Sequence, residues 1–218
     1  FYNQKINSQW AFNVAGFLTR GYGYYEEYKT GQNYPDYGLP ASSQTDLVRQ
    51  LWLDNYFYGS IFSFQKQNAN SQFTLGGGWN KYDGKHYGIV TWTPQGSTNG
   101  KHYYDLTAYK QDFNIYSKLQ QQLSKYWTGF ADVQLRAIKY DINGFKDNPQ
   151  LILNKNYLFI NPKLGITYNK NNYQAYLSYS LASKEPNRDD FEANKNQQPK
   201  PETLHDIELG AEKKTAKY

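Results

Sequence analysis

Residues 173–182 read Tyr-Gln-Ala-Tyr-Leu-Ser-Tyr-Ser-Leu-Ala, and their side chains alternate in polarity. An extended chain places successive side chains on opposite faces, so Leu177 and Leu181 lie on one face while Gln174 and Ser178 lie on the other. Such a strand either buries its apolar face in a protein core or turns it toward lipid. This choice constrains the whole fold.

The same alternation recurs along the chain and predicts an all-β fold of about eight strands. The expected strands are 10–20, 46–65, 72–80, 113–123, 127–140, 157–167, 173–182 and 202–213. One segment has an alternative, because Leu119 and Leu123 lie four positions apart around three glutamines, which have good helix propensity. A helix over 113–124 therefore stays open.

The connections between these segments alternate in length. Long ones are expected at 21–45, 83–105, 141–156 and 183–201, and short turns at 66–71, 124–125 and 169–172. In an up-and-down antiparallel sheet this order places every long loop at one end and every short turn at the other. Outer-membrane barrels show that asymmetry, whereas soluble sandwiches mix loop lengths.

The polar faces indicate which side meets water. Asp132, Gln134 and Arg136 share one face of a single expected strand, and burying them without partners would cost several kcal/mol. A hydrated lumen accepts them, so the apolar face is expected to point outward. Aromatic residues make up 18% of the chain at a mean hydropathy of −0.90, and they gather near the turns and near the long loops, as two interfacial girdles require.

Composition excludes several other classes. No run approaches the roughly 18 apolar residues of a membrane-spanning helix, and the absence of cysteine excludes disulfides and thiolate sites. The net charge of +5 is spread among acids without a basic run, so no nucleic-acid partner is expected. No catalytic or metal site and no cofactor is expected, because the three histidines lack paired spacing and Asp189 with Asp190 reads as loop charge.

Several motifs resemble the barrel region of TonB-dependent outer-membrane receptors. The most specific is Ser-Lys-Glu-Pro-Asn-Arg-Asp-Asp-Phe at 183–191, followed by the segment 199–210, and segments 13–17, 21–26 and 51–59 also match. The resemblance implies a barrel of about 22 strands around a plug domain. It also implies import of a scarce nutrient, such as an iron-siderophore, cobalamin or a glycan, with energy relayed by TonB.

The chain lacks a recognisable plug, a TonB box and a closing strand that ends in an aromatic residue, so residues 1–218 are expected to be an internal part of the barrel. The resemblance implies a non-enzymatic protein of the Gram-negative outer membrane. Its expected partners are membrane lipid, the TonB complex acting through a plug, a small nutrient and a surface lipoprotein. Two alternatives stay open: a soluble all-β carbohydrate-binding module, and a complete eight-stranded barrel whose first and last strands pair.

Ligand capture is expected at aromatic residues of the long loops, because exposed aromatic faces stack on sugars or planar chelates. Anchoring at the membrane interface is the alternative role of these rings. Arg136, with Lys118 and Lys163, is expected to attract an anion in the lumen, or else to form salt bridges there. The candidate ligand-binding residues are Tyr24, Tyr25, Tyr34, Tyr37, Trp92, Tyr103, Tyr104 and Arg136.

Overall fold

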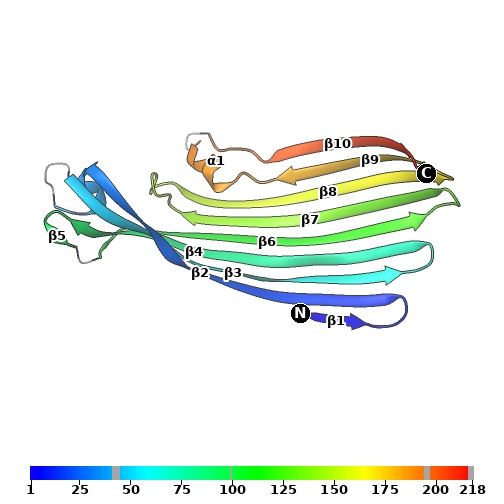
Figure 1. Cartoon of the computed structure of the whole chain (residues 1–218), viewed down its shortest axis with the longest axis horizontal. Coiled ribbons are helices and arrows are strands. Elements are labelled where there is room, and N and C mark those ends of the chain that lie inside the picture. The colour runs from blue at the N-terminus through cyan, green and yellow to red at the C-terminus, as the bar shows by residue number, and fades with distance from the viewer. Residues whose placement is uncertain (41–44, 99, 194–196, 216–218) are drawn as a thin grey trace.

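A computed structural model of the chain describes residues 1–40, 45–98, 100–193 and 197–215 (Figure 1). Within these residues ten strands form one antiparallel sheet in the order β1-β2-β3-β4-β6-β7-β8-β9-β10, with β5 paired to β4. The strands are β1 (Tyr2–Lys5), β2 (Trp10–Gln32), β3 (Thr45–Gln67), β4 (Ser71–Thr93), β5 (Gly96–Ser97), β6 (His102–Gln122), β7 (Trp127–Asn143), β8 (Ile152–Lys170), β9 (Tyr173–Lys184) and β10 (Glu202–Lys213). The predicted all-β, up-and-down fold is confirmed.

Short and long connections lie at opposite ends of the sheet, as predicted (Figure 1). The turn between β8 and β9 is the tightest at the short-turn end, since only Asn171 and Asn172 separate the two strands. Asn171 has a φ of 54°, a left-handed conformation that asparagine tolerates better than most residues. At the far end the connections carry the 3-10 helix η1 (Tyr34–Tyr37) and the short helix α1 (Arg188–Ala193).

Two details of the sequence-based prediction are wrong. Most strands are longer than predicted, although β10 has the predicted bounds. β2 continues to Gln32, and the register pairs Tyr24 with Trp52 and Tyr28 with Val48 where a loop was expected. The helical alternative for 113–124 also fails, because β6 runs unbroken to Gln122 and pairs with both β4 and β7. In the described part of the chain, no helix is long and apolar enough to cross a membrane.

The apolar face of the sheet is exposed. The register places Leu135 opposite Ile115 and Ile160, and Leu135 and Ile160 are 42% and 55% exposed. Leu177 is 49% exposed, whereas its neighbour Ser178, on the opposite face, is 9% exposed. A water-soluble sandwich would bury these leucines and expose the serine. We call the leucine side the outer face and the side of Ser178 the inner face.

Buried side chains cluster at the loop end. One cluster combines Ile138, Tyr140 and Phe159 of the sheet with Phe145 of the β7–β8 connection and Phe191 of α1. Another joins Tyr34 and Tyr37 of η1 to Leu47 and Val90. The long connections therefore fold onto the sheet rather than extending away from it.

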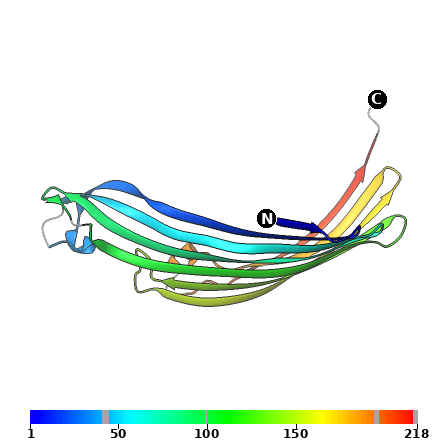
Figure 2. The ribbon, with the colours of Figure 1, turned by 90° about the horizontal axis from the view of Figure 1, so that it is seen from below.

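The sheet is curved but open (Figure 2). Among the described residues β1 pairs only with β2, and β10 pairs only with β9. The pairing between first and last strands that a complete eight-stranded barrel requires is therefore not formed.

Candidate functional site

The inner face carries a hollow of about 600 Å³ near the loop end, which we call the basic hollow. Its rows follow from the register: Tyr25, Leu51 and Tyr104 lie in one row, and Leu53, His86 and Leu106 lie in the next. Lys146 of the β7–β8 connection and Arg188 of α1 complete one end. Gly23 also lines the hollow, and Tyr22, Tyr24 and Trp52 border it from positions that the register assigns to the outer face.

The charged groups of the basic hollow are all cationic. Lys146 and Arg188 line it, no carboxylate does, and neither cation forms an ion pair with a described residue. The Arg188 guanidinium lies 5.1 Å from the centre of the Phe145 ring, and its buried Nε has no hydrogen-bond partner in the described part of the chain. His86 lies 3.2 Å from the Tyr82 hydroxyl, and burial, followed by the charge of Arg188, lowers its pKa.

A second hollow of about 530 Å³ adjoins the first and shares Tyr104, Leu106 and Lys146 with it. Its charges are mixed, because three aspartates line it together with Arg49. Arg49 donates two hydrogen bonds to Glu27, of 2.9 and 2.7 Å, and one of 3.0 Å to the Tyr37 hydroxyl. The hydrogen bonds from Arg49 lower the pKa of Glu27, so this pair is ionised at neutral pH.

The structure brings together five of the eight predicted ligand-binding residues. Tyr24, Tyr25 and Tyr104 line the basic hollow, and Tyr37, Tyr103 and Tyr104 line the second. The Tyr24 ring lies 4.4 Å from that of Trp52. Tyr34 is buried and its hydroxyl lies 3.0 Å from Gln95 Oε1, while Trp92 lines neither hollow. Ligand binding by these residues stays a prediction.

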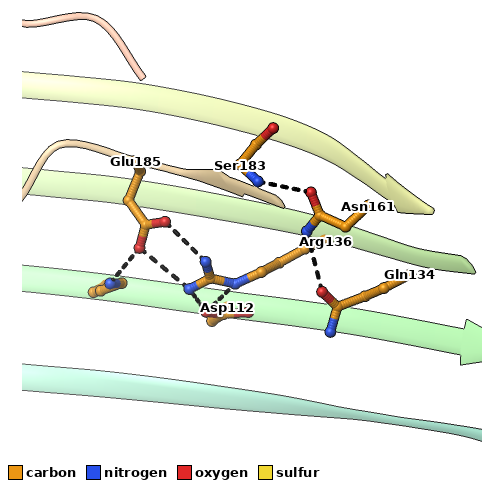
Figure 3. Close-up of polar contacts among 7 residues, drawn as sticks. Asp112, Gln134, Arg136, Asn161, Ser183 and Glu185 are labelled. Atoms are coloured by element: carbon orange, nitrogen blue, oxygen red, sulfur yellow. Dashed lines mark hydrogen bonds and ion pairs between the residues drawn. The ribbon is translucent and has the colours of Figure 1, made fainter. Parts of the chain in front are cut away.

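Arg136 lies deeper on the inner face, within a cluster of charges (Figure 3). Its Nε and one terminal nitrogen donate to Asp112 Oδ2, and its other terminal nitrogen donates to Glu185 Oε2 at 2.9 Å. Lys110 Nζ adds a bond of 2.8 Å to Glu185 Oε1. Arg136 therefore forms salt bridges on the inner face, which was the alternative to anion binding. Through Glu185 the cluster also holds the start of the β9–β10 connection against the sheet.

Sequence reasoning missed His86, Lys146 and Arg188 as lining residues. His86 and Arg188 are 102 positions apart in the sequence, and no local spacing connects the three residues. The one available signal was the motif at 183–191, which contains Arg188. In the described residues, no three His, Asp or Glu side chains converge as metal ligands.

No protein-family profile matches the chain, and no curated protein matches it. Two solved structures share its fold. The unliganded ferric citrate transporter FecA matches with a TM-score of 0.62 and 14% identity, over 96% of this chain and 30% of its own. The ferric-catecholate import receptor Fiu from E. coli K12, in its closed form, matches with a TM-score of 0.61 and 12% identity. This match covers 96% of this chain and 36% of Fiu.

At these identities the similarity is one of fold. The chain spans about a third of the length of either neighbour. One neighbour is named as a transporter and the other as an import receptor.

Proposed function

We propose that residues 1–218 form an internal section of the barrel of a TonB-dependent receptor in the outer membrane of a Gram-negative cell. The receptor takes up a small, scarce nutrient, of which iron-siderophores, cobalamin and glycans are the candidates. A plug domain outside this chain would carry the contact with TonB, and a surface lipoprotein is a further possible partner.

The observation that carries this proposal is the height of the apolar band on the outer face. In β7 every outer-face residue from Trp127 to Ala137 is apolar, and in β8 the same holds from Leu158 to Tyr168. Ten steps of about 3.4 Å, tilted by about 40°, rise about 26 Å, and lipid-facing bands of barrels are about 25 Å tall.

The band also ends at one level across β4, β6 and β7. The last row of the band aligns Ala137, Phe113 and Trp79. The next outer-face row, toward the long connections, aligns Lys139, Gln111 and Lys81. At the opposite edge Trp127 lies 4.9 Å from Tyr168, and Trp10 stacks on Phe64 at 4.5 Å. A sharp change from apolar to charged, with aromatic rings at the other margin, is what a bilayer selects.

A soluble carbohydrate-binding module fits these observations poorly. It would leave the leucines and isoleucines of four neighbouring strands in water, a patch far larger than soluble monomers expose. The basic hollow supports nutrient capture instead, because its rows of His86 and Tyr104 lie on the inner face beyond the level at which the band ends.

The test is uptake in the cell that makes the intact protein. We expect the protein in the outer-membrane fraction, and we expect deletion of its gene, or of TonB, to reduce uptake of at least one labelled nutrient to background. The panel holds ferric citrate, a ferric catecholate, a ferric hydroxamate, cyanocobalamin and a maltooligosaccharide. Recovery of the protein in the soluble fraction, or unchanged uptake of the whole panel in both deletions, would refute the proposal.

A further inference from the structure

We propose that the basic hollow selects a negatively charged ligand with a flat, apolar body, and that Lys146 and Arg188 hold its anionic group. This inference rests on the proposed function and names the ligand class of the same receptor.

The sign of the charge comes from the lining. Lys146 and Arg188 reach the hollow from two different connections, and no carboxylate lines it to neutralise them. Lys146 also lines the adjoining hollow, where Asp36, Asp105 and Asp147 accompany it and Arg49, so Arg188 has the less compensated charge of the two. In a recess with apolar walls and no carboxylate among its lining residues, cations attract an anion more strongly than they would in open water.

Arg188 is held in place for this role by contacts that leave its charge available. Phe145 supports one side of the guanidinium, and Phe191, three residues later, is 2% exposed. Glu185, three residues earlier, is fixed by Lys110 and Arg136. A guanidinium positioned in this way offers a rigid fork of donors that matches a carboxylate or a catecholate edge.

The body of the ligand is inferred from the remaining walls. Tyr25, Leu51, Leu53, Tyr104 and Leu106 supply aromatic and aliphatic surface. Tyr104 packs edge-on against Tyr103, with ring centres 5.0 Å apart, so its face has a fixed direction. The volume of about 600 Å³ lies in the range of small-molecule sites. A ligand with planar rings gains stacking contacts there that a purely polar anion does not.

The experiment measures the affinity of the intact, detergent-solubilised protein for three probes. Ferric tris(catecholate) combines negative charge with flat rings, ferric citrate is an anion without rings, and a ferric trihydroxamate is neutral. We expect ferric tris(catecholate) to bind most tightly. Arg188→Gln should weaken its binding about 10- to 100-fold, Lys146→Gln should weaken it less, and Arg188→Lys should retain part of the affinity.

The matched control is Lys139→Gln, which removes the same charge from an exposed lysine on the outer face and should change no affinity. Heat-modifiable migration on gels shows that each variant is folded. If Arg188→Gln weakens binding of the neutral trihydroxamate as much as binding of ferric tris(catecholate), the role of charge is wrong. If the wild type binds ferric citrate as tightly as ferric tris(catecholate), the role of the rings is wrong. If no probe binds while uptake of cobalamin or a glycan depends on TonB, the ligand class is wrong and the proposed function stands.

Discussion

Replacing Val133 by arginine is expected to destabilise the intact protein in a bilayer by about 2–4 kcal/mol, the cost of a basic residue on the lipid face near the midplane. Val133 lies midway along the apolar run of β7, is 42% exposed, and faces outward between Ser117 and Pro162 of the neighbouring strands. Its charge would have no water and no partner at that depth. Urea unfolding in lipid vesicles measures the change.

The adjacent variant Gln134→Arg is the control, because it introduces the same side chain on the inner face. It removes one hydrogen bond of 3.2 Å from Asn161, so we expect a loss of about 1 kcal/mol or less. If the two variants destabilise the protein equally, or if Gln134→Arg is the more harmful, the assignment of faces is wrong.

Removing the Glu185 carboxylate is expected to release the β9–β10 connection from the sheet. The Glu185 side chain is 6% exposed and accepts hydrogen bonds from Lys110 and Arg136. Breaking a buried ion pair costs about 3–5 kcal/mol, and we expect about 3 for Glu185→Leu because Lys110 is partly exposed. Phe191→Ala should act similarly, at about 3 kcal/mol, by emptying the site beneath α1. Hydrogen exchange over 185–193 measures both effects.

The pH dependence of the same connection has a definite sign. Burial alone would raise the pKa of Glu185, but its bonds to Lys110 and Arg136 hold that pKa below its ordinary value. Its contribution is therefore complete above the unfolded pKa and is lost as the pH falls through the folded pKa. Because the intrinsic rate of amide exchange falls as the pH falls, the readout is the protection factor, the rate of an unfolded chain at the same pH relative to the observed rate. Protection over 185–193 that decreases on acidification in the wild type but not in Glu185→Leu supports this account. Unchanged exchange in Glu185→Leu and Phe191→Ala at neutral pH would contradict it.

The sequence predicts the strand portions next to the short turns because apolar and polar side chains alternate there between the outer and inner faces. Segment 157–167 and the turn at 169–172 are clear for that reason. The strand portions near the long connections were predicted to be loops. In 21–24, Gly-Tyr-Gly-Tyr, glycine alternates with tyrosine and no aliphatic face marks a strand. Cross-strand pairing with β3 and ring contacts such as that of Tyr22 with Trp52 stabilise this part, and neither is visible locally.

The candidate site was predictable only in kind. Tyrosines of the expected long loops predicted an aromatic surface, and two of them, Tyr25 and Tyr104, line the basic hollow. The position of Arg188 depends on α1 folding back onto the inner face, which is set by contacts of Phe191 and Glu185 with strands far away in sequence. For Arg136 the sequence left anion binding and lumen salt bridges open, and the structure pairs it with Asp112 of β6 and Glu185 of the β9–β10 connection.

The orientation of the two faces supports every other conclusion, and single-cysteine labelling tests it most directly, because the chain has no native cysteine. Spin labels at positions 135, 160 and 177 would report collisions with lipid-soluble oxygen, and labels at 134 and 178 would report collisions with a water-soluble nickel complex. The account predicts high oxygen and low nickel accessibility for the first set, and the reverse ratio for the second. Nickel accessibility at 135, 160 and 177 that equals or exceeds that at 134 and 178 would contradict it.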